Sequence, residues 1–110
     1  MERLMKGDIV VVLFPFSDLS SAKNRPAMVL AKPKGDGLIL CQITSKHTKD
    51  GHSIPVTESD FKSGSLNQDS NIRPNKIFTA DTSIIDYTIR TLSTTKTSTI
   101  VEAVCSIIRS

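Results

Sequence analysis

The stretch NRPAMVLAKPKGDGLILCQITS (24–45) holds two short apolar runs with a turn sequence between them. The first run, 25–32, has proline near its start, where a strand tolerates it, and then five apolar residues that predict a buried strand. The Asp-Gly pair that follows is typical of a hairpin turn, and a second apolar run occupies 38–45. The stretch therefore predicts an antiparallel pair, with Arg25 where one strand begins and Thr44 where the other ends.

The second of these strands has an alternating pattern, so its side chains fall into two sets on opposite faces of the sheet. One set is expected to form the core: Ile39, Cys41 and Ile43. The other set is expected on the opposite face: Leu40, Gln42 and Thr44.

The rest of the chain predicts more short strands and one helix. Strands are expected over 7–14, 53–57 and 71–81, with a turn and a small strand within 82–93 and a helix over 99–109. Thr99 followed by Glu102 matches a capping box at the start of that helix. Short strands separated by turns favour a mainly β fold, a compact antiparallel barrel with a C-terminal α-helix, in a single domain over 1–110.

Composition narrows the class of protein. The chain has 110 residues, 38% of them apolar, and no run of 18 apolar residues, so we expect neither disorder nor a transmembrane helix. The N-terminus lacks the features of a signal peptide and suggests a cytoplasmic protein. Cys41 and Cys105 both lie in apolar patterns and are expected to be buried free thiols. His47 and His52 share one loop but lack an evident third ligand, so no metal site is predicted.

Arg25 and Thr44 are the residues with the clearest chemical potential, because a hairpin would bring their strand ends together. The planar guanidinium fork matches phosphate oxygens, and the threonine hydroxyl adds a donor or acceptor. Together they could hold and stabilise a phosphorane. On the residues alone, Arg25 could equally be a surface ion-pair residue and Thr44 an ordinary strand threonine. The net charge of +3 does not decide between these interpretations.

Three segments, in order, resemble the MazF/PemK family of toxin endoribonucleases from type II toxin–antitoxin systems. The first is KGDIVVVLFPFSDLSSAKNRPAMVLA (6–31), the second is LCQITS (40–45) and the third is DFKSGSLNQDSNIRPNKIFTAD (60–81). The resemblance is colinear over roughly residues 6 to 93.

This resemblance implies a small SH3-like β-barrel, a homodimer, and cleavage of single-stranded RNA without metal or other cofactor. In the family, the 2′-hydroxyl attacks the adjacent phosphorus and leaves 2′,3′-cyclic phosphate and 5′-hydroxyl ends. By the same resemblance, Arg25 matches the catalytic arginine and Thr44 matches its partner hydroxyl residue. The residues expected to bind RNA are Ser45, Lys46, Ser70, Arg73 and Lys76.

The chain departs from the family pattern at two places. Some relatives have an acid/base aspartate where this chain has Asn75, which cannot relay a proton, and His47 is an alternative base. Relatives often have a glycine before the Leu-Ser pair, where Arg90 and Thr91 precede Leu92 here.

The resemblance also implies a cognate antitoxin whose acidic or apolar disordered tail covers the basic groove. Two other functions remain open: a non-catalytic SH3-like module that binds RNA or peptide, and a metal-dependent hydrolase.

Overall fold

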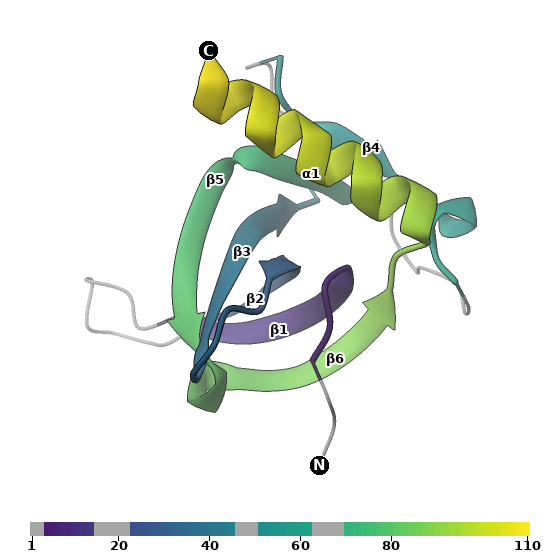
Figure 1. Ribbon diagram of the computed structural model, residues 1–110. Helices are drawn as coiled ribbons and strands as arrows, with labels where there is room; N and C mark the ends of the chain where they lie inside the picture. The colour runs from purple at the N-terminus through teal and green to yellow at the C-terminus, as the bar shows by residue number, and fades with distance from the viewer. Residues whose placement is uncertain (1–3, 15–22, 46–50, 63–69) are drawn as a thin grey trace.

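The computed structural model describes residues 4–14, 23–45, 51–62 and 70–110 of the chain. They form one antiparallel sheet in the order β4-β5-β3-β2-β1-β6, which curls into a half-barrel, and a C-terminal helix that lies across it (Figure 1). The strands are β1 (Asp8–Phe14), β2 (Lys23–Ala31), β3 (Gly37–Thr44), β4 (Ile54–Val56), β5 (Ser70–Asp81) and β6 (Ile85–Thr91). The helices are the short 3-10 turns η1 (Glu58–Asp60) and η2 (Thr82–Ile84) and the α-helix α1 (Thr94–Arg109). The predicted mainly β class with a C-terminal helix is confirmed.

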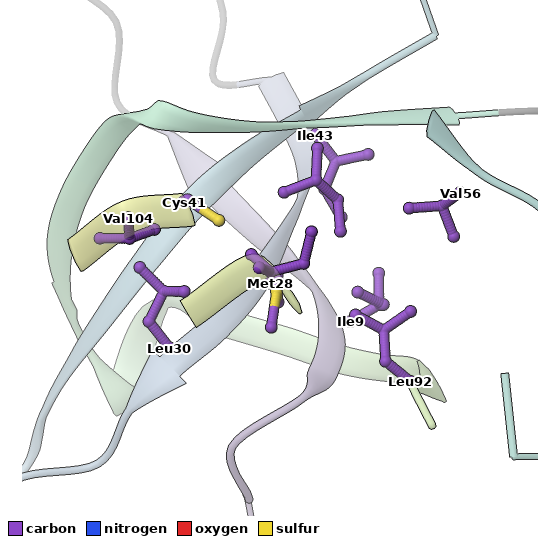
Figure 2. Close-up of a cluster of buried hydrophobic side chains, with 10 residues drawn as sticks. Ile9, Met28, Leu30, Cys41, Ile43, Val56, Leu92 and Val104 are labelled. Atoms are coloured by element: carbon purple, nitrogen blue, oxygen red, sulfur yellow. The ribbon is translucent and has the colours of Figure 1, made fainter. Parts of the chain in front are cut away.

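Apolar side chains are buried on both faces of the central strands. The cluster that includes α1 residues comprises Ile9, Met28, Leu30, Cys41, Ile43, Val56, Ile72, Leu92, Ile100 and Val104 (Figure 2). The cluster on the other face comprises Val10, Val12, Ala27, Val29, Leu38, Leu40 and Ala80. Placing Leu40 outside the core was therefore wrong: a strand covered on both faces reads as a continuous apolar run, as β1 does.

The Gly-Asp pair at the start of β1 ties three parts of the chain together. The Gly7 N–H donates to the Val29 carbonyl at 2.9 Å, and the Gly7 carbonyl accepts from the Leu92 N–H at 2.9 Å. The buried Asp8 carboxylate accepts a hydrogen bond from the Thr91 hydroxyl at 2.8 Å. These bonds join the beginning of β1 to β2 and to the end of β6, which holds the curled sheet in shape.

Helix α1 starts earlier than the capping pattern predicted. It begins directly after Ser93, whose hydroxyl oxygen accepts from the Lys96 N–H at 3.1 Å and so caps the helix. The prediction that Thr99 and Glu102 form a capping box was wrong. Thr99 lies inside the helix, and its hydroxyl donates to the Thr95 carbonyl at 3.1 Å.

Tertiary contacts explain why a threonine-rich segment is helical. The Ser93 N–H donates to the Asp60 carbonyl at 2.7 Å, and Lys96 Nζ lies 3.6 Å from an Asp60 carboxylate oxygen. Within this first part of the helix, Thr97 and Ile100 are buried. Burial against the sheet therefore outweighs the modest helix propensity of threonine.

The two cysteines differ in burial. Cys41 is fully buried in β3, as predicted, and burial raises the pKa of its thiol to about 12. Cys105 in α1 is only half-buried, and both thiols are free. Among the described residues, no helix is long and apolar enough to cross a membrane.

Candidate functional site

Three strand ends meet at one end of the sheet: β2 begins there, β3 ends there and β5 begins there. In the β2–β3 pair, Ala27 lies opposite Gln42, and the same register continued by two positions brings Arg25 opposite Thr44. In the β3–β5 pair, Asn71 lies opposite Thr44. Because residues opposite each other share a face of the sheet, Arg25, Thr44 and Asn71 form one row across the three strands.

A pocket of about 440 Å³ opens at these strand ends. Its lining consists of Asn24, Arg25, Pro26, Ile43, Thr44, Ser45 and Ser70. Arg25 is exposed and Thr44 is half-buried. The guanidinium and the hydroxyl therefore belong to residues that line one shared space, as a common phosphate would require.

The strand behind Arg25 explains why this side chain is well anchored. Residues 27–30 of β2 are buried, and Arg25 itself is in register with the buried Val12 of β1. Pro26 disfavours helical geometry at the residue before it and keeps Arg25 extended. A charged side chain thus stands at the accessible end of a strand whose remainder is fixed in the core.

The other predicted site residues lie at different depths along β5. Ser70 lines the pocket, whereas Arg73 lies opposite Gln42, further along the strand. Lys76 is exposed and lies in an irregularity of β5, where the register shifts between the partners of Cys41 and Gln42. Neither Arg73 nor Lys76 lines the pocket.

The other candidate site residues do not all lie at the pocket. Ser45 lines the pocket and is exposed. Lys46 and His47 lie outside the described residues. Asn75 is half-buried in the β5 irregularity, and His52 is exposed.

Sequence reasoning missed two amides near the site. Asn24 lines the pocket beside Arg25, and Asn71 lies opposite Thr44. The β2–β3 register that brings Asn24 near the end of β3 belongs to a connection over 32–36, and a two-residue Asp-Gly turn would have predicted a different register. The β3–β5 pairing that places Asn71 joins strands distant in the sequence and has no comparable local signal.

Charge is segregated along the strands. The far end of β3 and β5 carries a second pocket, of about 910 Å³, whose charged lining residues are Lys32, Asp36, Asp81 and Asp86. The Asp81 carboxylate accepts from the Ser83 N–H at 2.8 Å, and this bond lowers the pKa of Asp81. The charged lining of this second pocket is thus mainly acidic, whereas Arg25 is the charged residue in the described lining of the first pocket. Within the described ranges, no group of three or more His, Cys, Asp or Glu side chains could hold a metal ion.

Comparison with known proteins places this chain in a family. Residues 5–108 match the model of the family described as PemK-like, MazF-like toxin of type II toxin–antitoxin system. The chain belongs to this family. A comparison with curated proteins gave no match.

Solved structures of other proteins share the fold of this chain. One is the Mycobacterium tuberculosis toxin MazF-mt6, with a TM-score of 0.71, 19% identity and coverage of 93% of this chain and 96% of that one. Another is an endoribonuclease in complex with its cognate antitoxin from Mycobacterial species, with a TM-score of 0.71, 11% identity and coverage of 97% and 96%. A third, an Mtb toxin, has a TM-score of 0.61, 17% identity and coverage of 89% and 97%. At these identities the likeness extends to the fold.

Proposed function

We propose that this PemK/MazF-like toxin is a metal-independent endoribonuclease that cleaves single-stranded RNA at the Arg25–Thr44 pocket. The observation that carries the proposal is that Arg25 and Thr44 line the same pocket, at the end of the sheet away from the carboxylates. The solved structure of a similar fold described as an endoribonuclease agrees with it.

In the proposed reaction, the 2′-oxygen of one nucleotide attacks the adjacent phosphorus and the bond from phosphorus to the 5′-oxygen breaks. A base takes the proton of the 2′-hydroxyl, and an acid returns a proton to the departing 5′-oxygen. The products are a 2′,3′-cyclic phosphate and a 5′-hydroxyl end.

Arg25 would donate hydrogen bonds to the non-bridging oxygens, which gain negative charge as the phosphorane forms. Thr44 would donate its hydroxyl hydrogen to the same group and fix its orientation. Guanidinium holds its proton at neutral pH, so Arg25 stabilises charge and does not serve as the base. The Asn75 carboxamide does not titrate either, and we propose His47 as the base because an imidazole can accept a proton near neutral pH.

The remaining basic residues would position the RNA backbone. Arg73, Lys76 and Lys46 supply positive charge on β5 and in the segment after β3. Each phosphate contact releases counterions, so log K for a single strand should fall with log salt by about 0.7 per contact. Binding that stayed flat between low and moderate salt would remove these residues from the interface.

The toxin family supports an antitoxin partner, and one similar structure is a complex with a cognate antitoxin. We expect that partner to cover the Arg25 end with an acidic or apolar segment and to compete with RNA. We also propose a homodimer in the cytoplasm, where messenger RNA is available. Exposed apolar side chains on the neighbouring strands β1 and β6, namely Leu13, Tyr87 and Ile89, favour contact with a second copy.

The test is incubation of the purified protein with labelled single-stranded RNA in EDTA, followed by analysis of the ends. Cleavage to cyclic phosphate and 5′-hydroxyl ends is the expected result. Binding without cleavage would instead indicate a non-catalytic RNA-binding module. Activity that appears only when divalent metal is restored would indicate a metal-dependent hydrolase.

A further inference from the structure

A second polar row lies just outside the Arg25–Thr44 row. The β2–β3 register, continued by one more position, brings Asn24 opposite Ser45, and the β3–β5 register, continued likewise, brings Ser45 opposite Ser70. Successive residues of a strand alternate between faces, so this row lies on the face opposite to Arg25 and Thr44. It shares that face with the apolar row of the strand ends, which contains Pro26 and Ile43.

The pocket at the strand ends is built mainly from this second face. Asn24, Ser45 and Ser70 supply neutral polar groups, and the half-buried Pro26 supplies apolar surface, whereas Ile43 also lines the pocket but is only 8% exposed. Arg25 is the one ionisable side chain among the lining residues described. The flat, uncharged ring of a nucleobase uses apolar surface for its face and neutral donors and acceptors for its edge, and the described lining supplies both.

We propose that this pocket receives the base of a nucleotide adjoining the scissile phosphate, and that Asn24 reads the edge of that base with a preference for adenine. This inference rests on the proposed ribonuclease function. It adds a specificity-determining residue to a site whose chemistry is carried by Arg25 and Thr44.

The position of the pocket makes the adjoining base the natural occupant. Arg25 and Thr44 contribute to its lining, so a phosphate held by them leaves its own nucleotide within reach of Asn24. Bases of single-stranded RNA are unstacked and can be turned into such a pocket. Both Asn24 and Ser45 are exposed, so an incoming base meets them directly.

Asn24 is better suited to discriminate than the two serines. A hydroxyl rotates and can donate or accept, so it tolerates every base. A carboxamide presents a donor and an acceptor side by side, and adenine offers the matching pair at N6 and N7. A good bidentate contact of this kind discriminates against a wrong base by roughly tenfold or more.

The test is sequencing of the 5′ ends that the protein generates from a pool of random single-stranded RNA. With the natural chain, adenine should be enriched next to the cleaved bond. Asn24→Ala should reduce that enrichment by roughly tenfold. Asn24→Asp should move it toward cytosine, because a carboxylate accepts from the cytosine N4 amino group.

Asn71→Ala is the matched control. It removes the same carboxamide from the same end of the sheet but from the Arg25–Thr44 row, on the opposite face. Its rate of cleavage can change, but the base found next to the cleaved bond should remain the same. If Asn71→Ala altered the motif and Asn24→Ala did not, the assignment of the reading residue would be overturned.

Failure of this inference can be told apart from failure of the proposed function. If the natural chain cleaves RNA but shows no adenine preference, or Asn24→Ala retains it, the pocket assignment is wrong while the ribonuclease stands. If no RNA is cleaved, binding of 2′-deoxy oligonucleotides that differ in one base still tests the pocket. An adenine preference that Asn24→Ala abolishes supports it, and equal binding of all four bases overturns it.

Discussion

Replacing Gly7 by alanine tests how the start of β1 is packed against α1. Gly7 has a φ of +94°, a backbone conformation that residues with a side chain rarely adopt, and a Cβ added there would lie 2.7 Å from the Thr97 hydroxyl oxygen. Gly7 is held by backbone hydrogen bonds to Val29 and Leu92, and Thr97 is buried, so neither side can move away easily.

The cost has two parts that other glycines allow us to separate. A strained positive φ costs about 1–3 kcal/mol, and overlap in a packed site costs about 1–3 kcal/mol. Gly35 has a φ of +99° but no atom within 4 Å of its added Cβ, so Gly35→Ala measures the first part alone. Gly37→Ala is the control that should carry neither cost, because Gly37 has an ordinary φ and no atom lies within 4 Å of its added Cβ.

We expect Gly7→Ala to lower the free energy of unfolding by about 2–6 kcal/mol. At about 4–8 °C per kcal/mol, Tm should fall by about 8 °C or more. Urea unfolding of the three single variants gives the comparison, and Gly7→Ala combined with Thr97→Ala should recover the overlap part. If Gly7→Ala destabilised the protein no more than Gly35→Ala, or if Thr97→Ala gave no recovery, the packing argument would be refuted.

Two further predictions concern the helix and the buried thiol. Ser93→Ala should lower the free energy of unfolding by about 1 kcal/mol, because the Lys96 N–H loses its capping acceptor. Thr99→Ala should leave the free energy of unfolding nearly unchanged. An equal loss of stability in the two variants would contradict the assignment of Ser93 as the cap. Because burial raises the Cys41 pKa from 9.0 to about 12, the native state keeps a proton that the unfolded state loses. The free energy of unfolding should therefore decline as pH rises above about 9, and Cys41→Ala should flatten that decline. In the native protein a thiol reagent should modify the half-buried Cys105 while Cys41 reacts only after unfolding, and rapid native labelling of Cys41 would contradict its burial.

Much of the fold was predictable because local chemistry and tertiary structure agree. The apolar runs in β1, β2 and β3 each favour a strand by themselves. The hairpin between β2 and β3 was also predicted, although its connection is 32–36 and Gly37 of the Asp-Gly pair is already the first residue of β3. Helix α1 was predicted too short because its first turns depend on contacts with Asp60 and on burial of Thr97, which involve distant parts of the chain. Leu40 was misplaced for a similar reason, since alternation alone does not tell whether one face or both faces are covered.

The candidate site was predictable in part. Arg25 and Thr44 lie on strands joined by a short turn, so their proximity follows from a hairpin register. The nearness of Ser70 and Asn71 depends on the β3–β5 pairing, which joins segments far apart in the sequence. The charge separation between the two ends of the sheet likewise emerges only when those strands pair.

The most direct measurement is the single-turnover rate of RNA cleavage by Arg25→Ala, compared with the natural chain and with Arg109→Ala. Arg109 is exposed in the last turn of α1, so its replacement makes the same change in net charge outside the pocket. We expect Arg25→Ala to lower the rate by about 10²–10³-fold with an unchanged Tm, while Arg109→Ala cleaves normally. Cleavage by Arg25→Ala at the natural rate would contradict a catalytic role for Arg25.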